Sequence, residues 1–310
     1  MNNERELSAV RVNMQSIEAA RPNTFAVQRV LKDSDVIYEY QIGGSWTTDK
    51  PKQRPEGKRV VFDEVNDFRA ARDAYFAWID INNLRTANRV QDKLLEKPER
   101  PDTILSRILQ ARKIAEPLVL FVPWGVRPTG PFGQSERTVL DALESTQNIL
   151  NQRNIPTEIL LMPADLYATV VNNQVDSQTA SAYFEQVSTE AEKRGFSVKP
   201  WSEIRDQNWT EYSDRATELT EEKIREILSQ QKMDEAIKAA NRRSGYTQTD
   251  DIQRAALAYL RERICEAEIV ESKYKPIKLS VVPKNKDNEV DRELPRMYLI
   301  PPALQLPWLK

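Results

Sequence analysis

The segment Pro117-Leu-Val-Leu-Phe-Val122 is a continuous apolar run, and it leads into the loop Pro123-Trp-Gly-Val-Arg-Pro-Thr-Gly-Pro-Phe-Gly-Gln134. A short run that is apolar at every position predicts a central strand covered by helices on both faces. Loops of about 12 residues or more are uncommon and are often functional. This strand and its loop therefore indicate both the fold class and the place where function is expected.

Helical and strand patterns alternate on both sides of this strand. Helices are predicted over 63–95, 102–111, 135–153, 177–194, 220–241 and 249–272, and further strands over 157–162, 196–199, 277–282 and 296–300. Strands that alternate with helices indicate an α/β fold, with a Rossmann-like, mostly parallel sheet flanked by helices. The last two strands flank a charged turn at 284–288 and could add an antiparallel edge at the C-terminus.

The first 62 residues show one clear pattern, a hairpin. Apolar and polar side chains alternate over Asp35–Ile42, and the turn pair Gly43-Gly44 follows, so a strand at 45–48 or 58–62 would complete the hairpin. We therefore expect an N-terminal extension, 1–62, with this hairpin. A main domain over 63–310 would follow, with a helical lead-in and the α/β sheet.

The chain contains no histidine among its 310 residues. This absence excludes Ser-His-Asp and Cys-His nucleophiles, two-histidine zinc helices and histidine-carboxylate iron sites. An enzyme with this composition would use Lys, Arg, Tyr, Asp, Glu or Ser. The single cysteine, Cys265, cannot form an internal disulfide and is expected to be a buried thiol in a helix.

Charge and hydropathy favour a small molecule as the binding partner. The net charge is −2, with 45 basic and 47 acidic residues, so no global field attracts nucleic acid or membrane. The longest apolar stretch, Pro117–Trp124, is far shorter than the roughly 20 residues that span a bilayer. The polar start Met1–Glu4 has no apolar signal-peptide core, and a cytoplasmic location is expected. The sequence does not indicate an oligomeric state.

The loop after the first strand carries the strongest candidate ligand-binding residues. Arg127 can donate two hydrogen bonds to a phosphate or carboxylate, and the loop's three glycines permit close approach of backbone. Ser135 can cap the following helix, whose N–H groups attract anions. The spacing matches neither nucleotide-binding glycine motif, and a simple long connection remains the alternative. The candidate binding residues are Arg127, Gly125, Thr129, Gly130 and Gly133.

Two further segments follow later strands. Asp165, with Tyr167 nearby, could orient a hydroxyl or an amine or act as a base, although a helix cap is the alternative. Trp201-Ser-Glu203 could face a ligand or could close the end of the sheet by packing. Because ligands bind beyond the carboxyl ends of strands in open α/β sheets, these segments are expected at one rim. Tyr259 and Glu262, one helical turn apart, form either a catalytic pair or a packing pair.

Four segments carry a resemblance to a known family. Leu118–Gly133 takes the place of a strand and loop with Lys-Ser-Pro-Asn, and Pro163-Ala-Asp165 that of Ser-Asp-Gly. Lys278-Leu-Ser-Val-Val-Pro283 is similar to Arg-Leu-Ser-Ile-His-Pro, and Leu306-Pro-Trp-Leu309 is similar to Thr-Pro-Trp-His. These elements, in this order, resemble the isocyanide (isonitrile) synthase family over about residues 103–310. The chain lacks the Lys-Ser-Pro-Asn element, and Val282 and Leu309 replace the two family histidines.

The resemblance implies a biosynthetic enzyme of secondary metabolism that turns the α-amine of an amino acid such as tyrosine or tryptophan into an isonitrile. It implies condensation with a sugar phosphate, ribulose 5-phosphate, without metal or cofactor. Arg127 would be the phosphate or carboxylate clamp, Asp165 the amine-orienting group and Lys278 an electrophile partner. Because the matching residues are mainly framework types, the resemblance supports the fold more strongly than the reaction.

Two alternatives stay open. One is a tRNA-dependent aminoacyl transferase of the cyclodipeptide-synthase type, in which Ser135 would be the nucleophile and tRNA the only nucleic-acid partner. That family places Glu four residues after its helical Tyr, whereas Arg263 follows Tyr259 here. The other alternative is a binding or assembly protein that keeps the fold without the chemistry. A flat apolar patch near Trp46 or Trp308 would favour this second alternative.

Overall fold

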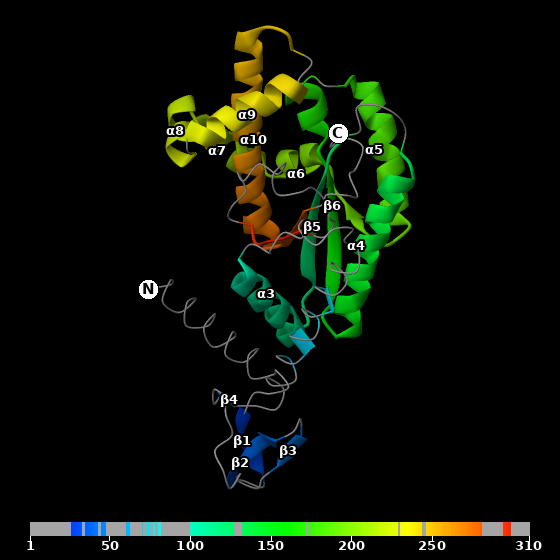
Figure 1. The fold of residues 1–310 in the computed structure, drawn as a ribbon, viewed down its shortest axis with the longest axis vertical. Helices are drawn as coiled ribbons and strands as arrows, with labels where there is room; N and C mark the ends of the chain where they lie inside the picture. Colours follow the sequence, from blue (N-terminus) through cyan, green and yellow to red (C-terminus); the bar gives the residue numbers. More distant parts are fainter. Residues whose placement is uncertain are drawn as a thin grey trace. The chain divides into compact units, whose positions relative to one another are not determined.

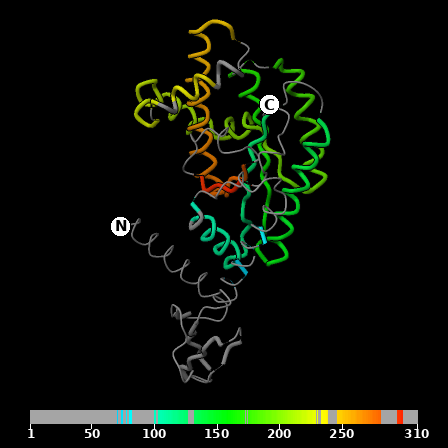
Figure 2. The backbone as a smooth tube through the Cα atoms, in the orientation of Figure 1, coloured from blue at the N-terminus to red at the C-terminus, as the bar shows by residue number. Residues whose placement is uncertain are grey.

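The computed structural model describes two compact units. One comprises 1–87, 100–118 and 146–157, and the other comprises 88–99, 119–145 and 158–310. Within these ranges the structure describes 26–32, 35–42, 45–47, 60–62, 70, 73, 74, 77, 80, 81, 100–126, 132–171, 173, 175–228, 230–243, 246–280 and 294–298. Figure 1 draws the strands among the first 62 residues, and Figure 2 traces the backbone of the later residues in colour. The predicted last element, Leu306–Leu309, lies outside them, as does the side chain of Trp46.

The first unit contains a sheet of four short strands in the order β3-β2-β1-β4. The predicted hairpin is confirmed, because β2 (Asp35–Ile42) pairs antiparallel with β3 (Ser45–Thr47). A further strand, β1 (Ala26–Lys32), pairs antiparallel with β2 and parallel with β4 (Val60–Phe62). The N-terminal region therefore holds more regular structure than its sequence pattern indicated.

The first unit also contains helices with buried alanine and isoleucine positions. α3 (Pro101–Ile114) confirms the helix predicted over 102–111. Ahead of it, helical positions at three- and four-residue spacing are buried at Ala70, Ala74, Ala77 and Ile81. Asp73 and Asp80 in this helical stretch form ion pairs with Arg112 (3.0 Å) and Arg153 (2.7 Å).

The large sheet confirms the predicted α/β fold class. Its strands are all parallel and lie in the order β7-β6-β5-β8-β9. Their bounds are β5 (Leu118–Trp124), β6 (Thr157–Pro163), β7 (Ser197–Val198), β8 (Ile277–Ser280) and β9 (Arg296–Tyr298). Burial along β5 and β6 is nearly continuous, as expected for strands covered on both faces.

The antiparallel edge expected at the C-terminus is wrong. β9 pairs parallel with β8, with Lys278 beside Arg296 and Ser280 beside Tyr298. Parallel neighbours need a connection of about a dozen residues or more, and the chain between Ser280 and Arg296 is long enough for one. The charged run within it resembled a hairpin turn, which is why the sequence favoured the other direction.

Helices separate and flank the strands of this sheet (Figure 1). They are α4 (Gln134–Gln152), the π-helix η2 (Tyr167–Val171), α5 (Ser177–Glu192), α6 (Trp201–Gln207), α7 (Trp209–Glu218), α8 (Glu221–Ile227), α9 (Gln230–Arg243) and α10 (Thr249–Tyr274). The helix predicted over 220–241 is divided near Leu228. Gly195, with φ of +76°, follows α5 in the left-handed conformation that the predicted helix end requires.

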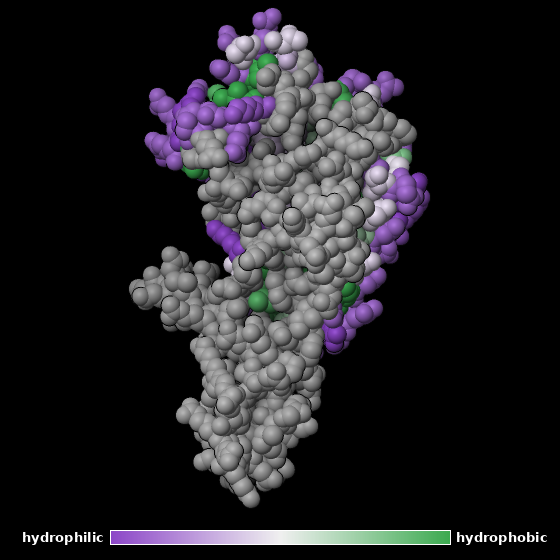
Figure 3. All heavy atoms as spheres, in the orientation of Figure 1, coloured by the Kyte–Doolittle hydropathy of each residue, from purple (hydrophilic) through white to green (hydrophobic). Residues whose placement is uncertain are grey.

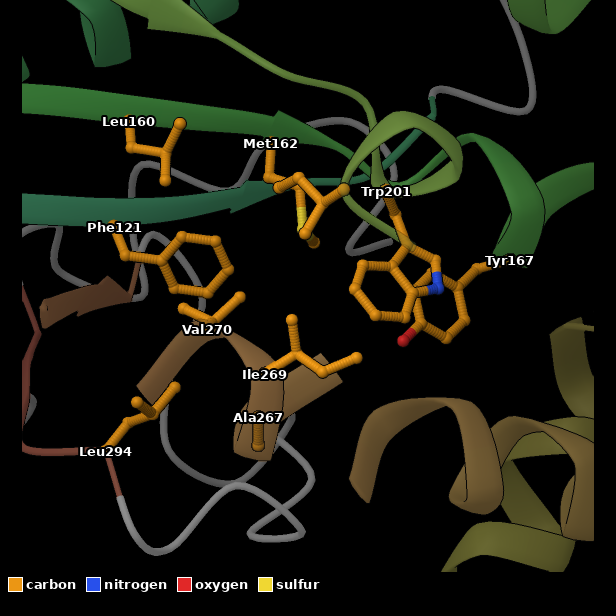
Figure 4. Packing of buried hydrophobic residues seen from close by; sticks show 10 residues of the cluster. Phe121, Leu160, Met162, Tyr167, Trp201, Ala267, Ile269, Val270 and Leu294 are labelled. Atoms are coloured by element: carbon orange, nitrogen blue, oxygen red, sulfur yellow. The ribbon is translucent and has the colours of Figure 1, made fainter. Parts of the chain in front are cut away.

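The sheet of the second unit is buried on both faces. On one face, Phe121, Leu160 and Met162 pack with α6 and α10, as Figure 4 shows. On the other face, the Trp124 indole donates to the Tyr183 hydroxyl of α5 at 3.2 Å. Phe121 and Trp124 are three residues apart, so their side chains leave β5 on opposite faces.

A second apolar cluster joins α10 to α8, α9 and the end of α7. Leu219, Ile224, Met233 and Leu260 are among its buried residues, and so is Cys265, as predicted. Burial raises the pKa of the Cys265 thiol to about 12, so the thiol stays protonated. Hydrophilic side chains predominate on the outward surface of these short helices (Figure 3). Among the described helices, none is long and apolar enough to span a membrane.

Candidate functional site

The strand order reverses at β5, with β6 and β7 on one side and β8 and β9 on the other. In open parallel sheets, a ligand crevice lies beyond the carboxyl ends of the strands at such a reversal. We call the carboxyl ends of β5 to β8, with the residues that directly follow them, the switch rim. The loop after β5, singled out from the sequence, begins at this rim.

Two hydrogen bonds donated by backbone N–H groups place the three sequence-selected segments beside one another. The Ala164 N–H, after β6, donates to the Trp124 carbonyl of β5 at 2.8 Å. The Ser202 N–H, after β7, donates to Oδ1 of Asp165 at 3.1 Å. The segments that follow β5, β6 and β7 therefore meet at the switch rim.

Asp165 holds the start of α6 from a different part of the chain. Its Oδ1 accepts from the Ser202 N–H in the first turn of that helix, and its own carbonyl accepts from the Thr169 hydroxyl at 2.9 Å. The carboxylate is half-buried, and no donor to Oδ2 is present in the described parts of the chain. Capping thus fixes one oxygen of Asp165 and leaves the other as an acceptor.

A second carboxylate at the rim, Glu136, was missed from the sequence. It is fully buried in the first turn of α4, and its Oε2 accepts from the Gly133 N–H at 3.0 Å. Glu at the third helical position often bonds back to the N-cap in this way. The spacing Gly133-x-x-Glu136 before an apolar run was the signal, but glycine stands where that motif has Ser or Thr.

The structure describes two of the remaining predicted residues of the β5 loop, Gly125 and Ser135. Gly125 is half-buried, and Ser135 lies exposed within the first turn of α4, which begins one residue earlier than expected. Arg127, Thr129 and Gly130 lie outside the described residues, so their predicted roles stay predictions.

Lys278 lies below the switch rim. It is level with Phe121 of β5, whereas Ala164 and Asp165 are level with Trp124 or beyond it, about 10 Å further along the strands. Lys278 and its neighbour on β9, Arg296, are 2% and 0% exposed, so two buried cations lie side by side. Within the described ranges, no group of three or more carboxylate or thiol side chains is placed to hold a metal ion.

Next to the rim, side chains of η2, α6, α7 and α10 form a network of aromatic and charged groups, the tyrosine–carboxylate cluster. Its members are Trp201, Tyr167, Tyr212, Glu262, Arg263 and Glu266. Oε1 of Glu262 accepts from the Tyr212 hydroxyl in a short hydrogen bond, and Oε2 accepts from the Trp201 indole at 2.8 Å. Both oxygens of Glu262 are therefore used within the protein.

Glu266 forms the second half of the cluster, one turn further along α10. It accepts from the Tyr167 hydroxyl at 2.6 Å and forms a short ion pair with Arg263. The Arg263 guanidinium also lies over the Tyr167 ring, 5.8 Å from its centroid. Tyr167, predicted to bind substrate, directs its hydroxyl to a buried carboxylate, and its ring belongs to the same apolar cluster as Trp201 (Figure 4).

Burial raises the pKa of Tyr167 well above its ordinary value, and the nearby Glu266 charge raises it further. Burial and the hydrogen bond to Glu262 raise the pKa of Tyr212 as well. Both phenols therefore remain protonated donors far into the alkaline range.

These two phenols predict a pH dependence of stability. Their folded pKa values are raised, so their contribution is fully present below about pH 10, the pKa of an unfolded tyrosine, and is lost as the pH rises above it. The midpoint of urea unfolding should fall between about pH 10 and 12. The substitution Tyr167→Phe should make that fall shallower. Equal slopes for the Tyr167→Phe variant and the unmodified protein would contradict this assignment.

Comparison with known proteins supports a relationship in fold. No family model matches the chain, and no curated protein matches it in sequence. The structure is similar to the crystal structure of the PvcA protein from Pseudomonas aeruginosa, with a TM-score of 0.53 and 15% identity. The similarity covers 75% of this chain and 87% of that chain. At this level of identity the similarity shows a shared fold, and in fold it agrees with the resemblance inferred from the sequence.

Proposed function

We propose that this chain is an isocyanide-synthase-like enzyme, or a divergent relative, that condenses the amine of an amino acid with a sugar phosphate such as ribulose 5-phosphate. The observation that carries this proposal is the fold shared with PvcA over most of both chains. The meeting of three sequence-selected segments at the switch rim supports it further. The substrates would occupy the crevice where the strand order reverses.

Asp165 is the proposed amine-orienting group. Its Oδ1 is held by the Ser202 N–H, so the carboxylate has a fixed direction, and Oδ2 can accept from a substrate ammonium or amine. A carboxylate with one oxygen anchored and the other available can also receive a proton from that amine. The role needs no histidine, in agreement with the composition of the chain.

Arg127 is the proposed clamp for a phosphate or carboxylate, because its guanidinium can bind either group through two parallel hydrogen bonds. Lys278 is the proposed electrophile partner. It lies on β8, next to β5, on the side of the crevice where the strand order reverses. Lys278 is 2% exposed and lies about 10 Å from the rim, so a substrate must extend from the rim over the face of the sheet to contact it.

The substitution Asp165→Asn tests the proposal at its central residue. The amide oxygen can still accept from the Ser202 N–H, so the cap is kept while the negative charge is removed. With an amino acid and ribulose 5-phosphate as substrates, isonitrile formation measured by mass spectrometry should fall about 100-fold or more. The matched control is Asp206→Asn on the same helix α6, where the carboxylate is 65% exposed.

Unchanged isonitrile formation in Asp165→Asn would contradict the role of that residue. No isonitrile from the unmodified protein with any amino acid would contradict the reaction itself. In that case, retention of aminoacyl-tRNA on a filter by the protein would favour the aminoacyl transferase. The substitution Ser135→Ala would then test whether Ser135 is its nucleophile. Absence of both activities would leave the non-catalytic binding or assembly protein.

A further inference from the structure

A cavity of about 520 Å³ lies along the first half of α10, outside the switch rim. Residues of η2, of α7 and of the start of α10 line it, together with Tyr246. None of the predicted rim residues within the described ranges is among the lining residues. Cavities of roughly 300 to 1,000 Å³ are the usual size for small-molecule sites.

Arg261 gives this cavity a guanidinium whose terminal nitrogens have no hydrogen-bond acceptor among the described residues. Its Nε donates to the Leu219 carbonyl at 3.0 Å, which fixes the position of the guanidinium. In the described ranges, no carboxylate forms an ion pair with Arg261. The terminal nitrogens of an arginine held in this way present a planar pair of donors, which suits a carboxylate or phosphate.

The other charged groups of the cavity already have partners inside the protein. Arg254 forms a short ion pair with Asp251, and both oxygens of Glu262 accept from Tyr212 and Trp201. The formal charges of the two arginines and two carboxylates in the lining sum to zero, so Arg261 would bind an anion through its available donors and not through a net positive charge. The cavity does not offer a carboxylate that needs an ammonium group.

The rest of the lining is apolar and aromatic. Val170 on η2 is 69% exposed, which is unusual for a large apolar side chain, and it lies at this cavity. The Tyr212 and Tyr246 side chains and small residues such as Ala258 complete the wall. π-Helices are rare and often occur at functional sites, so the exposure of Val170 on η2 also points to a ligand.

We infer that this cavity binds a small organic anion with a flat aromatic or apolar body. The anionic group, a carboxylate or a phosphate ester, bonds to the Arg261 guanidinium, and the body packs between Val170 and the tyrosines. This site is separate from the proposed catalytic rim. Binding can therefore be tested in the absence of any isonitrile-forming activity.

Calorimetric titration of the full chain with four aromatic probes tests the inference. 4-Hydroxyphenylacetate carries a carboxylate, phenyl phosphate carries a phosphate ester, tyramine has only an amine, and 4-methylphenol has no charge. One or both anions should bind more tightly than the amine and the neutral phenol, and the stronger anion identifies the natural headgroup. Arg261→Gln should weaken anion binding about tenfold or more, since it removes a charge-assisted hydrogen bond.

Two further variants separate binding from folding. Ala258→Phe fills the cavity without changing its charge and should abolish binding of the same probe. Arg225→Gln, on the exposed face of α8, removes an arginine outside the cavity and should leave the affinity unchanged. The inference would be overturned if neither anion bound, if tyramine bound as tightly as the anions, or if Ala258→Phe and Arg261→Gln kept full affinity.

Discussion

Replacement of Trp201 by alanine is expected to lower the free energy of unfolding by about 3–5 kcal/mol, the range for truncating a large buried aromatic side chain. Trp201 is completely buried and packs with Phe121, Met162 and Ile204 at the junction of the sheet, α6 and α10. Its indole is also one of the two donors that hold Glu262. Urea titration followed by far-ultraviolet circular dichroism measures the effect.

Two companion variants separate packing from hydrogen bonding. Trp201→Phe keeps most of the buried ring and loses the indole donor, so it should cost about 1–3 kcal/mol, the penalty for an unmade buried hydrogen bond. Trp209→Ala removes a tryptophan that is 54% exposed, and it should have much less effect than Trp201→Ala. Equal losses from the substitutions at 201 and 209 would show that Trp201 is not a central core residue.

Replacement of Glu266 by leucine is expected to lower the free energy of unfolding by a similar amount, about 3–5 kcal/mol. The substitution removes the carboxylate that pairs with the buried Arg263 and accepts from Tyr167, while both of those groups stay buried. A buried cation that loses its carboxylate partner is costly because it cannot regain water. Urea titration again supplies the measurement.

The double variant Glu266→Leu with Arg263→Met tests the cause of this loss. Since it removes both charges of the pair, it should recover part of the stability that Glu266→Leu alone loses. Glu221→Leu, which breaks the exposed pair with Arg225 on α8, is the matched control and should change stability little. A double variant less stable than Glu266→Leu would contradict the assigned cost of the buried charge.

Much of the fold could be predicted because its strands and long helices carry local patterns. The apolar run at 117–122 and the helical spacing through α4, α5 and α10 predicted those elements within a few residues. Gly195 marked the end of α5 because the backbone there takes a positive φ, a conformation that glycine adopts most easily. These signals depend on neighbouring residues, and they are therefore present in the sequence itself.

Elements that depend on distant contacts were missed. α6 starts at Trp201, and the acceptor for the Ser202 N–H in its first turn is Asp165, which lies well before it in the chain. β1 has no strict alternation, and its pairing with β2 and β4 defines it as a strand. The direction of β9 was also set by tertiary pairing with β8, since the charged run before it resembled a turn.

In the candidate site too, features marked by neighbouring residues could be predicted, and contacts between distant residues could not. Glycines, prolines and strand ends indicated the rim segments, and the structure brings them together. The partners of Glu262 could not be predicted, because Tyr212 and Trp201 reach it from other helices. The sequence paired Glu262 with Tyr259 by helical spacing, whereas both carboxylate oxygens are taken by side chains far away in the sequence.

The most direct test of the proposed reaction follows the nitrogen atom of the substrate. Tyrosine or tryptophan labelled with heavy nitrogen at the α-amine would be incubated with the protein and ribulose 5-phosphate, and the products analysed by mass spectrometry. We expect an isonitrile that retains the heavy nitrogen, forms only when ribulose 5-phosphate is present and nearly disappears with Asp165→Asn. Absence of an isonitrile from the unmodified protein, or an isonitrile without the heavy nitrogen, would contradict the proposed reaction.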